Sequence, residues 1–379
     1  MALTNTVSAL TREKFLPILV DNIFNSNALC LKLLKNAEKL DGGVAINVPV
    51  EYAQNGNSGW LADTGATATA QAMTDIAQKA VYNWATAYNS INISQNEVHM
   101  NMGSNQVLSI LKAKMKNAEK TLRDLFGTAL FNAGLVTNGI TSINGCGTLA
   151  SGDYTGDDGS TAGGGVIEDL GTDTAVWHAP GNVDNTVVGY NRSLGGINSD
   201  SLTWWDSHIG SFPLSGGTRA VAEMVDATDV MTFAEFTSTT NGVADGVKAM
   251  TRAYSAASID NDQPDLIVTT QPIFDAYESS LQANKRFDGD ATLADAGFQT
   301  LRFKGATVVV DSHCDTGKMY FLNSKYLNFV VHAKRFFAME DFKPQETADV
   351  IQSRIFFMGQ LCASSPRMCS AMVDGPAGY

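Results

Sequence analysis

Alternating apolar and polar residues predict two strands early in the chain. The alternation is strict in residues 44–52, where Pro49 indicates a strand at the edge of a sheet. Residues 79–89 alternate as well, and a change of phase at Ile91 and Ile93 predicts a bulge or bend. The residues that share one face are Val44, Ile46, Val48, Val50 and Tyr52 in the first strand, and Tyr82, Trp84, Thr86 and Tyr88 in the second.

The two strands are joined by a tip, residues 54–75, made of polar and small residues. It is longer than the loops of compact domains usually are. A two-stranded ribbon also has too little core to be stable alone in water. We therefore expect a projecting finger that lies on another surface, and a second copy of the chain would provide one.

The segment from Phe15 to Leu40 has the mixed apolar spacing of a helix, which the AspGlyGly sequence at 41–43 ends. Phe15 and Phe24 belong to its apolar face. We interpret it as an N-terminal arm, with two placements open. It docks on its own domain, or it crosses onto a neighbouring copy.

One long helix is predicted at 104–133, beginning after the good N-cap residue Ser104 and ending before Gly134. Its apolar residues recur at alternating steps of three and four, which also permits a coiled coil. That alternative is weakened because the stripe lasts for only about three heptads. The stripe consists of Leu108, Leu111, Met115, Ala118, Leu122, Leu125 and Ala129.

The middle of the chain predicts loops and then a helical lobe. Residues 136–172 are rich in Gly, Thr, Ser and Asp, which is typical of a flexible surface loop or an insertion. Two helices are predicted around 219–226 and 242–258. A strand at 265–270 then leads into a helix through Lys285, with Thr270 as its cap and a proline in its first turn.

The last third of the chain predicts mostly strands. Apolar runs at 307–310, 319–322 and 327–331 are separated by turn residues and predict an antiparallel meander. Residues 348–363 alternate and predict a late strand that pairs with elements far back in the sequence. One face of this strand holds Ile351, Ile355 and Phe357, and the other holds Gln352, Arg354 and Phe356. The predicted fold class is α+β with mixed lobes.

The charge of the chain argues against nucleic-acid recognition. Lys and Arg number 26 against 39 for Asp and Glu, a net charge of −13. Binding to phosphate backbones depends largely on clustered positive charge. A wall that encloses DNA without gripping it needs no such charge. The sequence shows no signal peptide and no run of roughly 18 apolar residues for a membrane span, so we expect folding in a cytoplasm.

No motif predicts catalysis, a metal or a cofactor. The five cysteines lack the CxxC spacing of zinc and redox sites and are expected to be reduced, and GxSxG and HExxH are absent. The DSHCD sequence at 311–315 places His313 and Cys314 between carboxylates. Neighbours in a tight turn cannot all converge on one substrate. A hydrolase that uses His313 or Cys314 is therefore the weakest alternative.

The order of the expected elements resembles that of the Hong Kong 97-like major capsid proteins of tailed bacteriophages. The likeness is greatest in PDLIVTTQPIFDAYESSLQANKRF, FQTLRFKGATVVVD and GKMYFLNSKYLNFVV, and the pair Trp204 and Trp205 fits it too. It implies a subunit that self-assembles into hexamers and pentamers, which form an icosahedral shell around double-stranded DNA. The runner-up is an encapsulin-like compartment, which shares the fold but encloses enzymes.

The resemblance also divides the chain into the parts described for that family. These are an N-terminal arm at 1–40, an E-loop hairpin at 41–103, a peripheral or P domain at 104–217 with its spine helix at 104–133, an axial or A domain at 218–345, and a late P-domain strand with the C-terminal segment at 346–379.

Contacts between copies are expected from the finger and the arm, with burial within the same subunit as the alternative. The candidates are Trp60, Tyr82, Trp84, Tyr88, Phe15 and Phe24. Some family members cross-link a lysine to an asparagine, and Lys79 is the only lysine in 41–103, but we do not expect that chemistry here. The arm begins close to the N-terminus, so a separate scaffolding protein is expected, together with a portal and decoration proteins.

Overall fold

The computed structural model describes most of the chain from residue 27 onward. The predictions for Phe15, Phe24, Trp60, Trp204, the helix at 219–226 and nearly all of the Gly-rich segment lie outside the described residues. The described residues are 27–53, 75–100, 107–131, 136–137, 140–141, 146, 193–194, 197–198, 205, 207–211, 232–237, 239–240, 243–281, 300–346, 348–373 and 376.

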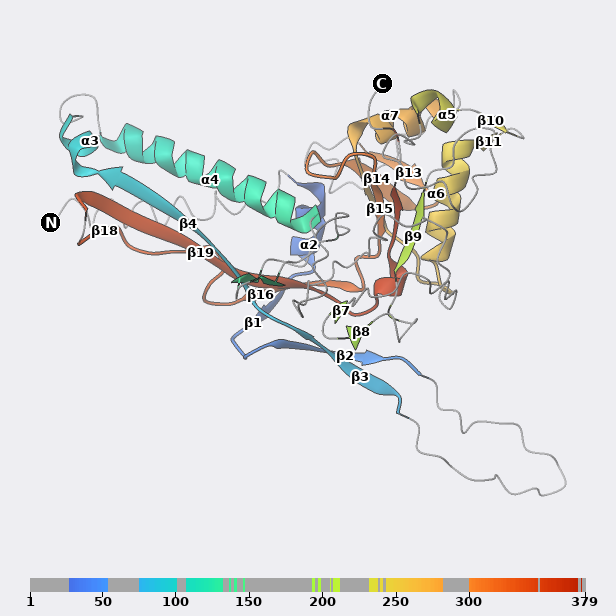
Figure 1. The fold of residues 1–379 in the computed structure, drawn as a ribbon, viewed down its shortest axis with the longest axis horizontal. Helices are drawn as coiled ribbons and strands as arrows, with labels where there is room; N and C mark the ends of the chain where they lie inside the picture. The colour runs from blue at the N-terminus through green and yellow to red at the C-terminus, as the bar shows by residue number, and fades with distance from the viewer. Residues whose placement is uncertain are drawn as a thin grey trace, which may run out of the picture.

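Two six-stranded sheets organise the described residues into a compact lobe and an elongated lobe (Figure 1). The compact sheet has the order β13-β14-β12-β15-β20-β9. Its strands are β9 (His208–Ser211), β12 (Leu266–Thr269), β13 (Thr300–Phe303), β14 (Ala306–Val310), β15 (Met319–Leu322) and β20 (Ser370–Val373). Short hairpins elsewhere are β5 (Val136–Thr137) with β6 (Ile140–Thr141), β7 (Ser193–Leu194) with β8 (Ile197–Asn198), and β10 (Thr239–Thr240) with β11 (Val243–Ala244).

The compact sheet is buried on both faces, so its strands read as continuous apolar runs. On one face, Ile267 of β12 belongs to a core shared with α5 (Phe233–Thr237), α6 (Asp245–Ala256) and α7 (Gln271–Ser280). On the other face, Leu266 and Val268 belong to the core shared with the elongated lobe. The α6 prediction is confirmed, while α7 ends at Ser280, short of Lys285, and the Thr270 side chain makes no capping hydrogen bond.

The predicted antiparallel meander is wrong. β12 lies between β14 and β15, parallel to the first and antiparallel to the second. The third strand, β16 (Leu327–His332), leaves the compact sheet and pairs with β19 in the elongated lobe. The turn residues predicted the breaks between these strands correctly. The pairing of the strands depends instead on burial, because β12 and β15 are buried at every residue.

The elongated lobe is built on the 14-residue strand β19 (Val350–Ala363), which confirms the late strand and its distant partner. β4 (Ala85–Ser94) pairs with it from Ala85 opposite Gly359 to Ser94 opposite Val350. On its other side β19 pairs with β16, and with two short strands. These are β17 (Ala338–Met339) and β18 (Lys343–Pro344), and a 3-10 turn, Pro366–Met368, follows β19. The chain therefore passes from the compact sheet to the elongated sheet after β15.

Helix α4 (Val107–Phe131) confirms the predicted long helix and packs mainly on this sheet, with a smaller contact to α2. Phe126 lies edge-on to Phe357 of β19, with ring centroids 4.6 Å apart. The predicted stripe holds for Met115, Ala118 and Leu122, but Leu125 is 46% exposed and Phe126 is buried in its place. A real helix turns every 3.6 residues, so its inner face drifts away from a seven-residue repeat.

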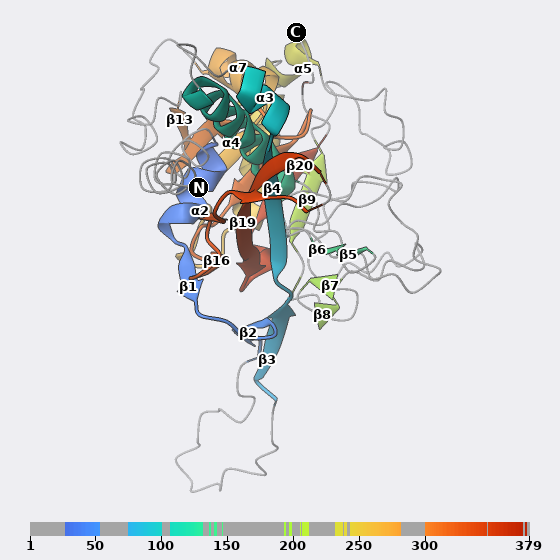
Figure 2. The same ribbon diagram turned by 90° about the vertical axis from the view of Figure 1, so that its left-hand side faces the viewer.

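The projecting ribbon consists of β2 (Ile46–Glu51) and β3 (Ala77–Tyr82), which pair only with each other. It is shorter than the predicted hairpin, because β4 belongs to the elongated sheet and α3 (Gln95–Met100) follows it. The change of phase lies at residues 83–84 and not near Ile91. Both views place the ribbon on the side away from α5 and α7 (Figures 1 and 2).

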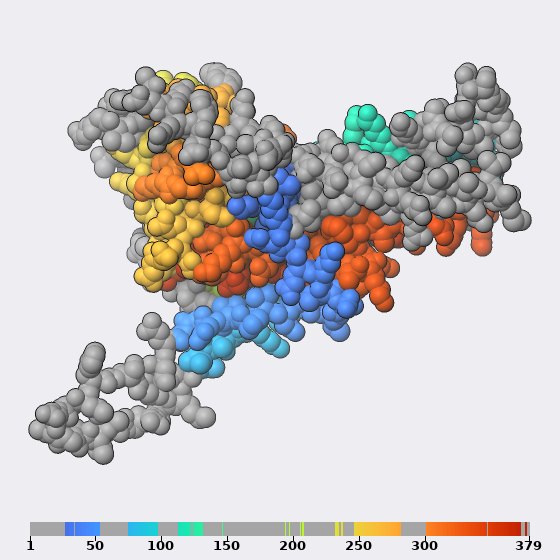
Figure 3. Space-filling model, turned by 180° about the vertical axis from the view of Figure 1, so that it is seen from behind, coloured from blue at the N-terminus to red at the C-terminus, as the bar shows by residue number. Residues whose placement is uncertain are grey.

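The predicted helix at 15–40 is correct only in part. The described helix, α2, covers Ala28–Lys35, and Glu38–Leu40 form β1, which pairs in parallel with β16. Residues 38–40 form a strand because they pair with the edge of β16. This is a tertiary contact, which the spacing of apolar residues within the segment cannot predict. In the space-filling view α2 and β1 cross the surface between the two lobes (Figure 3).

Candidate assembly site

The ribbon is fixed at its root by Tyr82. This side chain is 1% exposed, its hydroxyl donates to the Ala363 carbonyl at 2.7 Å, and the Ala363 N–H donates back to the hydroxyl. Next to it, the Gln360 amide donates to the Asn83 carbonyl at 3.0 Å. The last residue of β3 is thus tied to the end of β19. The ribbon leaves the molecule at a defined point, although its outer part has little core of its own.

The chain turns from the ribbon into the elongated sheet at Trp84. Its indole N–H donates to the Gly43 carbonyl at 3.0 Å, and its ring meets His332 edge-on with centroids 5.8 Å apart. The half-buried Trp84 therefore joins the segment before β2 to β16. Because Tyr82 and Ala85 are both buried, the two residues between them absorb the change of phase.

A partly exposed aromatic face lies farther out on the elongated sheet. Tyr88 on β4 is 68% exposed and stands opposite Phe356 on β19. The Arg335 guanidinium lies 5.3 Å from the Phe356 ring centroid, within the range of a cation–π contact. We call Tyr88, Phe356 and Arg335 the outer aromatic face. Aromatic and Arg side chains of this kind are enriched where proteins meet.

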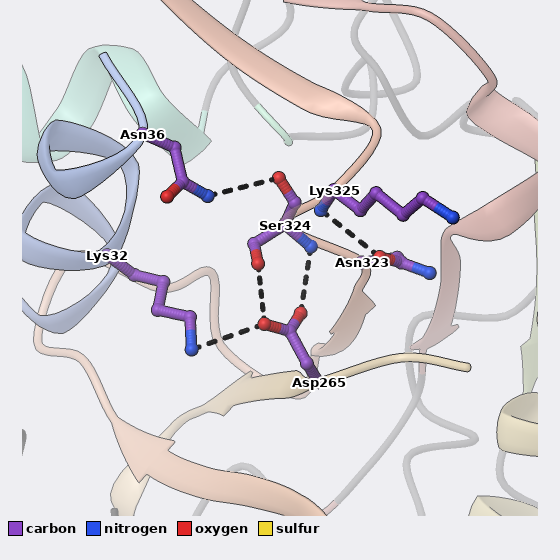
Figure 4. Close-up of polar contacts among 6 residues, drawn as sticks. All are labelled: Lys32, Asn36, Asp265, Asn323, Ser324 and Lys325. Atoms are coloured by element: carbon purple, nitrogen blue, oxygen red, sulfur yellow. Dashed lines mark hydrogen bonds and ion pairs between the residues drawn. The ribbon is translucent and has the colours of Figure 1, made fainter. Parts of the chain in front are cut away.

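Helix α2 is seated on the compact lobe by polar contacts at its C-terminal half (Figure 4). Lys32 forms an ion pair with Asp265 at 3.2 Å, and Asn36 donates to the Ser324 carbonyl at 3.4 Å. Asp265 also accepts from the Ser324 N–H at 2.8 Å and from its hydroxyl. In the same turn the Lys325 N–H donates to the Asn323 side chain. One carboxylate therefore joins α2 to the turn between β15 and β16, where the chain changes lobes.

The N-terminal end of α2 meets the compact sheet at Asp311. The Asn27 side chain accepts from the Cys30 N–H at 3.1 Å, as an N-cap does. The Leu29 N–H in the same turn faces the Asp311 carboxyl, which is almost fully buried. Burial raises the pKa of Asp311, and backbone hydrogen bonds from His313 and Leu29 offset this only in part.

The DSHCD turn has the wrong environment for a nucleophile. Burial raises the pKa of the Cys314 thiol well above its ordinary value, with Asp311 as a further cause. The reactive form of a cysteine is the thiolate, so this side chain is held in its unreactive state. Its thiol lies 3.6 Å from the Lys318 carbonyl. Among the described residues, no group of three His, Cys, Asp or Glu side chains has the arrangement of a metal site.

The predicted contact residues thus fall into different environments. Tyr82 is buried and bonded to β19, Trp84 is half-buried, and Tyr88 is exposed. Sequence reasoning missed Phe356 and Arg335, since Phe356 was assigned only to a face of the late strand and Arg335 carried no signal. The register between β4 and β19 places Phe356 opposite Tyr88, and Arg335 lies over the Phe356 ring. The pairing of strands that are distant in sequence cannot be predicted from alternation within one strand.

No model of a known protein family matches the sequence, and no curated protein matches it. No helix in the described part of the chain is long and apolar enough to cross a membrane.

Solved phage-related capsids resemble the structure over nearly its whole length. A chain of the Cyanophage A-1(L) capsid asymmetric unit is 16% identical, with a TM-score of 0.55 over 92% of this chain and 93% of that chain. The capsid of Cyanophage P-SCSP1u is 13% identical, with a TM-score of 0.47 over 90% and 86%. The capsid of a native GTA particle is 12% identical, with a TM-score of 0.46 over 90% and 89%.

The fold is assigned from the first of these likenesses, which also agrees with the two mixed lobes described above. The resemblance predicted from the order of elements is confirmed at this level. Over nearly all of its length, this chain has the fold of a phage capsid protein.

Proposed function

We propose that the protein is the major capsid protein of a tailed bacteriophage, which self-assembles into hexamers and pentamers of an icosahedral shell around double-stranded DNA. The observation that carries this proposal is the likeness to a phage capsid subunit over nine tenths of both chains. The shape supports it, because the ribbon of β2 and β3 projects from the two lobes (Figure 1). Elements of this kind bury their apolar residues on adjacent copies.

In this proposal the parts take the roles implied by the family resemblance. The segment before α2 is the arm, the ribbon of β2 and β3 carries the E-loop, α4 is the spine of the P domain, and the compact lobe is the A domain. The subunit is a virion component, assembled in the host cytoplasm with a separate scaffolding protein, a portal and decoration proteins. DNA is enclosed without sequence-specific binding, in keeping with the net charge of −13.

The first test is electron microscopy of the purified protein, which is expected to contain closed shells or rings of subunits. A compact monomer with a catalytic activity would refute the proposal and favour the hydrolase alternative. An encapsulin-like compartment also forms shells, so native particles must be opened and their contents identified. DNA supports the capsid assignment, and a protein cargo supports the compartment.

The outer aromatic face gives a sharper test with a matched control. Tyr88→Ala removes a largely exposed ring, while Thr86→Ala changes the next outward position on the same strand. We expect Tyr88→Ala to lower the yield of shells without lowering the thermal stability of the subunit, and Thr86→Ala to change neither. Equal yields for both variants would remove Tyr88 from the contacts.

Trp84→Ala is expected to impair assembly more than folding, because Trp84 sets the direction in which the ribbon leaves the elongated sheet. Its contacts with Gly43 and His332 lie within the subunit, so local loosening of the ribbon root accompanies the change. Shell yield and the circular dichroism spectrum are measured on the same preparation. An unchanged yield would contradict this role.

A further inference from the structure

Three parts of the molecule meet at the turn that follows β14. His313 in this turn lies between two carboxylates, with Nε2 at 3.4 Å from Asp124 Oδ1 and Nδ1 at 3.5 Å from Asp311 Oδ1. Asp124 belongs to α4, and Asp311 faces the first turn of α2. One imidazole therefore lies where α4 of the elongated lobe, α2 and the compact sheet come together.

The approach of α4 to this ring requires a glycine. A Cβ atom added to Gly127 would lie 2.5 Å from the His313 ring, a distance that real Cβ contacts do not show. Gly127 comes one turn after Asp124, so the helix backbone and the carboxylate both meet the same imidazole. The backbone of α4 and the His313 ring are therefore in direct contact.

Asp311 is incompletely satisfied where it is buried. Its side chain is 2% exposed, and Oδ2 has no hydrogen-bond partner among the described residues, although Oδ1 accepts from the His313 N–H at 3.0 Å. A buried carboxylate with a free oxygen is costly unless a positive charge or a proton compensates it. A protonated His313 is placed to supply that charge.

The thiols around this set stay neutral. Cys30 of α2, Cys314 of the same turn and Cys146 all have thiol pKa values raised, in each case mainly by burial. The turn also carries the ion pair of Lys318 with Asp315, 3.3 Å apart, and the Ser312 hydroxyl lies 3.4 Å from His313 Nδ1. Among the described groups that contact the imidazole, the titratable ones are Asp124 and Asp311.

We propose that Asp124, His313 and Asp311 form a proton-dependent clasp that fastens α4 and α2 to the compact sheet. A protonated imidazole donates from both ring nitrogens, one toward each carboxylate, whereas a neutral ring has a single N–H and loses one of the two bonds. The clasp therefore closes when the ring gains its second proton on acidification and loosens when that proton is lost. Protonation of Asp311 at lower pH weakens it again.

The consequence for a shell rests on the proposed function. If the two lobes are held more firmly in mild acid, the subunit is stiffer at the junction from which the arm also starts. The clasp then regulates the shape that each subunit contributes to the shell. The clasp itself is a property of the single chain and can be tested without shells.

The test is amide hydrogen exchange of the purified full chain at pH 5.5 and 7.5, with rates corrected for intrinsic exchange. Peptides covering 28–35 and 122–131 are expected to be roughly fivefold better protected at pH 5.5 in the wild type, as a charge-assisted bond of modest strength allows. His313→Gln and Gly127→Ala should abolish this difference. His332→Gln, which changes a histidine of the elongated sheet, should preserve it.

Asp124→Asn is the safeguard against misfolding, because the Asp124 side chain is 81% exposed and its replacement leaves the core intact. It should reduce the pH dependence in residues 122–131. No pH dependence in the wild type, or an undiminished one in His313→Gln, would overturn the clasp. If the exchange result holds but no shells form, the proposed function fails and the clasp stands. If shells form without the pH dependence, only the clasp is lost.

Discussion

Removing the hydroxyl of Tyr82 tests whether the root of the ribbon is fixed by its bonds to β19. In Tyr82→Phe the buried ring stays in place, so no cavity forms, but the Ala363 carbonyl and N–H both lose a partner. Leaving buried polar groups unpaired costs about 1–3 kcal/mol. Taking about 1.5 kcal/mol, we expect local opening at this point to become roughly tenfold more frequent.

The assay is amide hydrogen exchange, read in peptides that cover 77–82 and 359–364. Tyr88→Phe is the matched control, since it makes the same chemical change on the exposed Tyr88 of the neighbouring strand. Exchange should rise in the Tyr82→Phe variant at both ends of the bond and stay constant in compact-lobe peptides. A rise below twofold, or one equal to that of Tyr88→Phe, would refute the assignment of Tyr82 as the anchor.

Three further predictions concern stability and reactivity. Phe357→Ala should destabilise the protein by about 3–5 kcal/mol, because this ring packs against Phe126 and three other phenylalanines. Calorimetry of Phe357→Ala and Phe357→Leu measures the loss of stability, and a loss below about 1 kcal/mol in the alanine variant contradicts the prediction. Burial raises the pKa of the Cys362 thiol to about 12, so thiol reagents at pH 8 should label it only after unfolding, and rapid labelling of the native protein argues against this burial. Burial raises the pKa of Tyr277 to about 12, from about 10 in the unfolded chain, so the stability that this residue contributes is complete below pH 10 and is lost as the pH rises toward 12. Urea midpoints should therefore fall less steeply over this range in Tyr277→Phe than in the wild type. Equal slopes would exclude Tyr277 as the cause.

Elements with strong local signals were predicted well. The apolar stripe located α4, the strict alternation located β2, and the proline after Thr270 located the start of α7. In each case hydrogen bonding or periodicity within one segment decides the structure, so a single sequence contains the information. The boundaries shifted where a neighbour intervened, as when β16 turned the end of the predicted arm helix into β1.

Strand partners could not be predicted in the same way. The runs at β14, β15 and β16 look like a meander, since each is apolar and short turns separate them. In the structure β12 enters between two of them and β19 takes the third. Such pairing depends on which surfaces remain to be buried after the helices have packed, and that is a property of the whole chain.

The candidate site was predicted only in outline. The aromatic residues of the second strand were identified, but alternation alone gave Tyr82 and Tyr88 the same role, although the phase changes between them. The junction at Asp311 and His313 was set aside because it lacks the chemistry of an enzyme. Its contacts come from α2 and α4, which are distant in sequence, so only the folded structure brings them together.

The pairing of β4 with β19 has a consequence for biosynthesis. Ala85 of β4 pairs with Gly359, which follows it by more than 270 residues, so the elongated lobe cannot form until residue 359 has been made. Contacts of this range slow folding and leave the unpaired strand exposed on the nascent chain. A chain that is still being translated therefore lacks a finished elongated lobe, and in the proposed capsid role this topology disfavours the premature joining of incomplete chains.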